Sequence, residues 1–85
     1  MGELARLPNL GPALEAQLAA VGVTTARQLR ELGAREAWLR IQQVDASACI
    51  NRLTALEGAV RGVRKAALPA DVKEELKAFY NAHKL

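Results

Sequence analysis

Cysteine and histidine are almost absent from this sequence, which contains one of each among its 85 residues. Cys49 has no second cysteine with which to form an internal disulfide, and no cluster of cysteine and histidine residues has the spacing of a zinc site. We therefore expect neither a disulfide nor a metal. A single thiol is typical of a protein in a reducing, cytoplasmic location.

Long apolar runs are also missing. No segment approaches the roughly 18 consecutive apolar residues that a membrane-spanning helix needs. The first ten residues, MGELARLPNL, include Glu3 and no continuous apolar stretch, so they do not resemble a secretory signal peptide. The sequence therefore predicts no contact with a membrane.

Groups that could carry out catalysis do not occur together. His83 lies close to the C-terminal end without a neighbour that could position it as a general base, and Cys49 has no histidine to activate it. Paired carboxylates occur only on helix faces that should be exposed, as Glu31 with Glu36 and Glu74 with Glu75. We expect no enzymatic activity, no cofactor and no small-molecule substrate.

The sequence is rich in alanine, leucine and arginine, which are all good helix formers. Apolar residues recur at helical spacing in five segments that are separated by glycine, proline and capping residues. These segments are residues 12–21, 25–32, 34–44, about 47–68, and 69 onward. They predict a single compact all-α domain of five helices over residues 1–85, with its core over about residues 7–82.

Local signals mark the ends of several predicted helices. Pro12 suits a first helical position, and Gly22 and Gly33 can end helices because glycine adopts a positive φ. Thr25 is a predicted N-cap, and Gln28 three residues later completes a capping box.

The fourth helix should be long and central, capped by Asp45 or Ser47 and running about twenty residues to Leu68. One of its stripes is apolar and includes Leu53 and Leu56. A second stripe has only small residues, namely Ala55, Ala59, Gly62 and Ala66. This stripe either lets a neighbouring helix pack closely or forms an interaction face for a protein partner or a homodimer.

The excess positive charge lies in the C-terminal half. The net charge is +3, and residues 1–45 carry five basic and five acidic side chains, whereas residues 46–85 carry seven and four. Arg61, Arg64 and Lys65 form a basic arc on the predicted fourth helix. This arc either contacts phosphate or an acidic protein, or is a solvated face in which Glu57 pairs with Arg61.

The segment LPNLGPALEAQLAAVGVTTARQL, from Leu7, resembles the helix–hairpin–helix motif of DNA-binding proteins. In that motif, glycines bring backbone N–H groups and a helix N-terminus close to a DNA phosphate. Asn9 stands where the first glycine of the hairpin is expected, and Glu15 follows where a lysine is common. The turn is either architectural or a backbone contact made by Asn9, Leu10, Gly11, Pro12 and Ala13.

Residues 7–80 as a whole resemble the C-terminal domain of TfoX-type proteins, which regulate bacterial competence for DNA uptake. The resemblance rests on LPNLG (7–11), GVTTARQLRELGAREAWLRI (22–41) and LTALEGAVRGVR (53–64), followed by Pro69 and an amphipathic helix. It implies a small helical domain of the helix–hairpin–helix or SAM-like sort, without catalysis and with a role in the transcriptional control of competence.

Two binding functions follow. The neutral N-terminal half and the missing hairpin lysine favour a regulatory module that acts through protein–protein interaction. The alternative is weak, non-specific DNA binding through the turn and the basic arc. Under that alternative, Asn9→Gly should strengthen DNA binding because it would let the backbone approach more closely.

Overall fold

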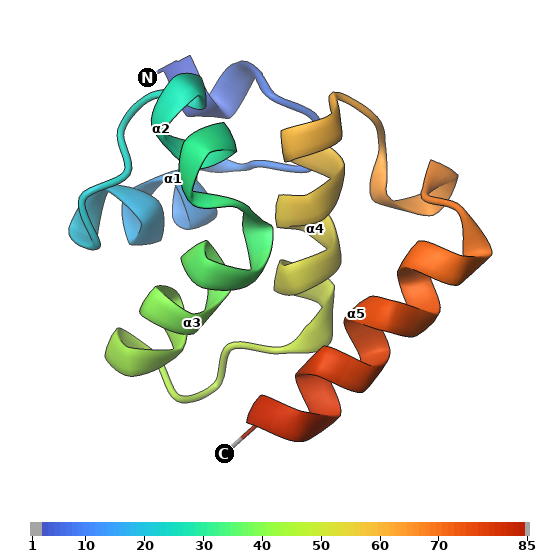
Figure 1. Ribbon diagram of the computed structural model, residues 1–85. Coiled ribbons are helices and arrows are strands. Elements are labelled where there is room, and N and C mark those ends of the chain that lie inside the picture. The colour runs from blue at the N-terminus through green and yellow to red at the C-terminus, as the bar shows by residue number, and fades with distance from the viewer. Residues whose placement is uncertain (1–2, 85) are drawn as a thin grey trace.

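The computed structural model describes residues 3–84, and its described residues form helices and turns without a strand (Figure 1). Five α-helices and two short 3-10 helices follow one another along the chain. They are η1 (Glu3–Arg6), α1 (Pro12–Ala20), α2 (Ala26–Leu32), α3 (Ala34–Val44), α4 (Ile50–Arg61), η2 (Lys65–Ala67) and α5 (Ala70–His83). The predicted all-α fold with five α-helices is confirmed.

Helix α4 lies at the centre, with α3 on one side and α5 on the other (Figure 1). It also contacts η2 and α2. Leu53, Leu56 and Ala59 of α4 are fully buried. The predicted central position of this helix is therefore confirmed.

The core is built from the apolar faces that the helical spacing predicts. Leu18 of α1, Leu29 of α2, Trp38 and Ile41 of α3, and Leu76 of α5 are all fully buried. Two half-buried aromatic side chains of α5 pack edge-on against Trp38, with ring centroids 6.1 Å (Phe79) and 5.7 Å (Tyr80) from its own. Since burial of each large side chain contributes about 1.5–3 kcal/mol, this cluster holds α5 against α3.

Helix α2 begins at the capping box that the sequence predicts. The Gln28 backbone N–H donates to the Thr25 hydroxyl at 3.1 Å, and the Thr25 N–H donates to the Gln28 side-chain oxygen at 3.2 Å. Gly33, with φ +86°, ends α2 and lets α3 start at the next residue. Both helix ends were predicted from residue type alone.

The predicted length of the fourth helix is wrong. α4 ends at Arg61, because Gly62 adopts a left-handed conformation with φ +75°. The Gly62 N–H donates to the Ala59 carbonyl at 3.2 Å and the Val63 N–H to the Gly58 carbonyl at 2.9 Å, which is the Schellman pattern of a helix C-terminus. The apolar periodicity continues past this glycine, but the helix does not.

The predicted cap of this helix is also wrong. α4 begins at Ile50 with Cys49 as its N-cap, and no side chain caps it. Asp45 is instead the C-cap of α3, and Ser47 lies in the connection between the two helices. At 12 residues, α4 is shorter than the 14-residue α5, so the central helix is not the longest one.

Candidate functional site

The turn between η1 and α1 has the backbone shape of a glycine-containing hairpin, although its central residue is an asparagine. Asn9 has φ +70° and is the only non-glycine residue with a positive φ in the described part of the chain. Asparagine is one of the few residues that adopt this conformation at low cost. The departure from the hairpin pattern at this position therefore leaves the conformation of the turn intact.

The Asn9 side chain fixes the turn to the segment that follows α4. Its Nδ2 donates to the Val63 carbonyl at 3.0 Å and to the Ala55 carbonyl at 3.4 Å. Its Oδ1 accepts from the Lys65 backbone N–H at 3.0 Å. Residues separated by more than fifty positions in the sequence are thus joined through one side chain, and a glycine could not make this connection.

Gly58 leaves the space that this connection needs. A Cβ atom on Gly58 would collide with Asn9 Nδ2 and would lie 2.7 Å from the Val63 carbonyl oxygen. The closest approach to α4 at this glycine is therefore made by a turn and a loop, and not by a neighbouring helix.

The basic arc predicted on the fourth helix is not a helical face. Arg61 lies in the last turn of α4 and pairs with Glu57 at 2.7 Å, a hydrogen bond that also raises the pKa of Arg61. Arg64 and Lys65 come after the helix end, and both are exposed. Among the described residues, neither of these two side chains has an ion-pair partner.

A third cation lies beside this segment. Lys73, in the first turns of α5, donates from its ammonium group to the carbonyl of Ala66 in η2 at 3.1 Å. Lys73 lies outside the basic arc predicted from the sequence, because Glu74 and Glu75 are expected to weaken the positive field of the lysines in this segment. We call Arg64, Lys65 and Lys73 the basic cluster.

The N-terminus of α1 is open. Gly11 is the N-cap and no side chain caps the helix, while Gly11, Pro12 and Ala13 are all exposed. The positive end of the helix dipole therefore faces outward. Glu15 places a carboxylate in the first turn, which reduces the attraction of this end for an anion.

The stripe of small residues does not form an interaction face. Ala55 and Ala59 are 7% and 0% exposed and belong to the interior, whereas Gly62 and Ala66 are exposed and lie beyond the end of α4. The four residues share a face only if the helix continues past Gly62. This candidate surface is therefore corrected, because two of its members are not accessible to a partner.

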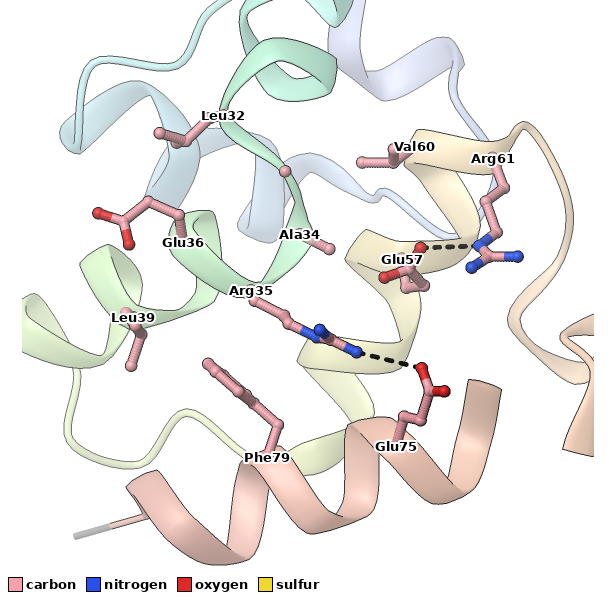
Figure 2. A pocket seen from close by; sticks show the side chains of 11 residues that line it. Leu32, Ala34, Arg35, Glu36, Leu39, Glu57, Val60, Arg61, Glu75 and Phe79 are labelled. Carbon is pink, nitrogen blue, oxygen red and sulfur yellow. Dashed lines mark hydrogen bonds and ion pairs between the residues drawn. The ribbon is translucent and has the colours of Figure 1, made fainter. Parts of the chain in front are cut away.

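A groove of about 580 Å³ opens between α3 and α5, over α4 (Figure 2). Half-buried apolar side chains from α2, α3, α4 and α5 line it, namely Leu32, Leu39, Val60 and Phe79. Arg35 of α3 reaches Glu75 of α5 across the groove at 3.5 Å, and the Glu57–Arg61 pair lies at its α4 side. No sequence motif marks this groove, because it results from the way α3 and α5 diverge.

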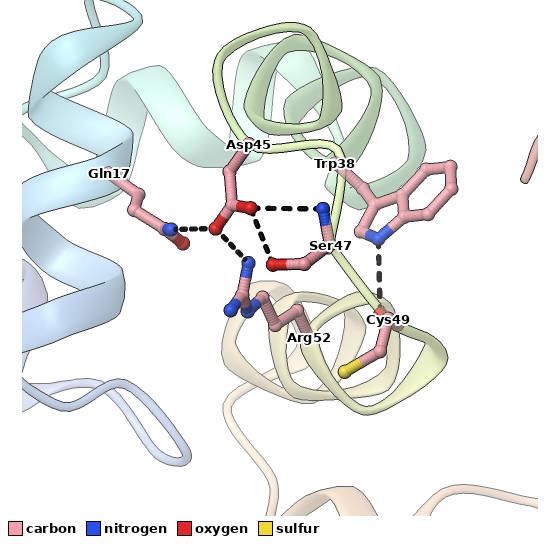
Figure 3. A network of polar contacts seen from close by, with 6 residues as sticks. All are labelled: Gln17, Trp38, Asp45, Ser47, Cys49 and Arg52. Carbon is pink, nitrogen blue, oxygen red and sulfur yellow. Dashed lines mark hydrogen bonds and ion pairs between the residues drawn. The ribbon is translucent and has the colours of Figure 1, made fainter. Parts of the chain in front are cut away.

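A second polar cluster has an architectural role (Figure 3). Asp45 Oδ1 accepts from the backbone N–H and the hydroxyl of Ser47, and Oδ2 accepts from Arg52 at 2.7 Å and from Gln17 at 2.9 Å. These hydrogen bonds, chiefly those from Ser47 and Arg52, hold the pKa of Asp45 well below its usual range. The cluster joins α1, α4 and the α3–α4 connection.

Within residues 3–84, no group of three or more His, Cys, Asp or Glu side chains is arranged to hold a metal. The His83 ring nitrogen Nδ1 lies 2.9 Å from the carbonyl of Phe79 in the same helix, and its ring stacks on that of Phe79.

None of the described helices is both long enough and apolar enough to span a bilayer.

The arrangement defines a small five-helix domain in which a glycine- and asparagine-dependent turn leads into the first helix. The chain belongs to the TfoX C-terminal domain family, whose profile matches residues 1–80. This family is one of regulatory domains and is not a known enzyme family. The family predicted from the sequence is thereby confirmed.

Related proteins match most of this chain. Protein Sxy of Escherichia coli K12 is 44% identical over 70 residues, which are 82% of this chain and 34% of Sxy. The chain thus spans about a third of the length of that curated relative.

Two crystal structures of a Listeria monocytogenes protein, one described as uncharacterized and one as of unknown function, have the same fold. The triclinic form has a TM-score of 0.92 and 44% identity, and the match covers 93% of this chain and 90% of that one. The tetragonal form has a TM-score of 0.91 and 44% identity, with 93% and 96% covered.

Proposed function

We propose that this domain is a non-enzymatic regulatory module of competence control that contacts the nucleic-acid backbone. The observation that carries the proposal is the Asn9 connection, which places the η1–α1 turn against the segment containing Arg64 and Lys65. The sequence suggested both surfaces separately. The fold supports their use together, because one side chain holds the turn beside two unpaired cations.

The chemistry of this combined surface suits a phosphate backbone. Exposed backbone N–H groups at the start of α1 can donate to phosphate oxygens, and the basic cluster supplies charge. Neutralising two or three phosphates gives a salt dependence with a slope of about −2 to −3 in log K against log salt. Binding should therefore be weak, independent of base sequence and sensitive to salt. A cytoplasmic location, as the composition predicts, is where such a contact would be made.

The test is a fluorescence-anisotropy titration of a labelled duplex at low and moderate salt, with charge-reversal variants. Arg64→Glu should weaken binding about 5- to 10-fold at low salt and reduce the magnitude of the salt slope by about 1. Lys84→Glu is the matched control, since Lys84 is exposed and is the C-cap of α5. The C-terminal end of α5 lies away from the η1–α1 turn (Figure 1). Equal effects of the two changes would indicate only a general charge effect and would contradict the proposed surface.

Protein–protein interaction, which the charge distribution favours, is the second candidate function. The groove between α3 and α5 supports it, because partly exposed apolar side chains surrounded by charged residues are common in protein interfaces. The partner then binds at the groove, since two of the four residues of the small-residue stripe, Ala55 and Ala59, are buried. The domain can carry both the proposed nucleic-acid surface and the groove, because neither the η1–α1 turn nor the basic cluster is part of the groove lining.

A further inference from the structure

The groove between α3 and α5 exposes apolar surface that the rest of the fold does not cover. Leu39 and Phe79 are only partly buried, although both pack against the core (Figure 2). Burial of such surface is favourable at about 25 cal/mol per Å². Covering of these side chains by another molecule would therefore be favoured by the hydrophobic effect.

The charges of the groove differ from those of the whole chain. Its lining contains two arginines and three glutamates, namely Arg35, Arg61, Glu36, Glu57 and Glu75, whereas the chain carries a net charge of +3. Two copies of a basic protein repel each other over most of their surfaces. At the groove this repulsion is weaker, because positive and negative side chains lie together on the same face.

The Arg35–Glu75 ion pair across the groove can be replaced at low cost by ion pairs with another molecule. Arg35 and Glu75 are 3.5 Å apart, and their side chains are 48% and 65% exposed. An exposed pair of this length contributes little to stability, typically about 0–1 kcal/mol. The Arg35 guanidinium also lies 5.7 Å from the centre of the Phe79 ring, so its displacement would uncover an aromatic face.

We infer that the groove is a self-association surface whose occupant is the groove of a second copy of this chain. In a two-fold symmetric interface, residue i of one copy meets residue j of the other, and residue j meets residue i. A face that carries Arg35 on one wall and Glu75 on the other meets this requirement, since each copy offers both charges. The partly exposed apolar side chains of the two grooves then face each other, and the two intramolecular pairs become two intermolecular ones. This inference does not depend on the proposed contact with nucleic acid.

The test uses light scattering coupled to size-exclusion chromatography, with the wild-type chain, Arg35→Glu, Glu75→Arg and their equimolar mixture. The wild type should approach twice the chain mass as its concentration rises through the micromolar range. Each single variant should stay at the chain mass, because like charges then face each other across the two-fold axis. The mixture should recover the doubled mass, since each intermolecular position again pairs opposite charges.

Two controls separate this result from a folding defect or a general charge effect. Arg27→Glu makes the same charge change in an exposed pair on α2, outside the groove, and should associate as the wild type does. Helical circular dichroism should be unchanged in every variant. Failure of the mixture to recover the doubled mass would overturn the inference, as would a wild type that stays at the chain mass up to about 1 mM.

Discussion

The side chain of Asn9 occupies the space that a Cβ atom on Gly58 would fill. The same side chain binds carbonyl oxygens before and after the end of α4 and the N–H of Lys65. The turn that leads into α1 and the segment with the basic cluster therefore form one unit. This unit is the basis of the nucleic-acid contact that we propose.

Gly58→Ala should destabilise the fold although alanine is the better helix former. In an open helix the change would be favourable by about 1 kcal/mol. Here the added methyl group meets Asn9 and the Val63 carbonyl, so the free energy of unfolding should fall by about 1–3 kcal/mol. Urea denaturation measures this change. In the Asn9→Gly background the cost of Gly58→Ala should be smaller by at least about 0.5 kcal/mol, whereas strictly additive effects would contradict the contact.

Asn9→Gly should weaken DNA binding, although the hairpin pattern alone predicts the opposite. Glycine keeps the positive φ but loses the hydrogen bonds to residues 55, 63 and 65, at a cost of about 1–3 kcal/mol in stability. The turn is then no longer held beside the basic cluster. Urea denaturation and anisotropy measure the two effects. Asn81→Ala, at an exposed position in α5, should lower neither the stability nor the affinity for DNA.

Gly62→Ala and Gly62→Leu should cost nearly the same stability. Nothing lies within 4 Å of the position of a Cβ on Gly62, so only its φ of +75° penalises a side chain, by about 1–2 kcal/mol. Gly62→Asn should cost less, since asparagine tolerates this conformation. Thermal denaturation compares the three variants. A much larger loss for leucine would mean that Gly62 packs closely, as the small-residue stripe suggested.

Acid should destabilise the fold partly through Asp45. Its pKa is lowered in the folded state, so its contribution is fully present above the unfolded-state pKa of about 3.9 and is lost as the pH falls below it. Between about pH 5 and pH 2, the free energy of unfolding of Asp45→Asn should therefore decrease less than that of the wild type. Glu31→Gln, which removes an exposed carboxylate of α2, is the control and should follow the wild-type curve. Equal pH dependence of Asp45→Asn and wild type would contradict this role of the Asp45 cluster.

The helices and their buried faces could be predicted from the sequence because they depend on local signals. The capping box at Thr25, the stop at Gly33 and the inward positions of Trp38 and Leu76 need only residue type and helical spacing. The end of α4 was missed because Gly62 can continue a helix or terminate it. The Schellman hydrogen bonds that select termination are visible only in three dimensions.

The candidate surfaces could be predicted less well. The turn and two cations were found as separate segments, but the Asn9 hydrogen bonds that join them cross more than fifty residues of chain. Lys73 reaches the cluster only because the chain turns at η2. The groove depends on the angle between α3 and α5, for which the sequence has no local signal.

The most direct test of the account is an amide NMR titration of the chain with a short duplex at low salt. We predict that the largest shift changes occur together at Gly11, Ala13, Arg64 and Lys65, and that they disappear at moderate salt. Changes confined to the groove residues, or no changes at low salt, would contradict the proposed nucleic-acid surface and leave the turn with an architectural role only.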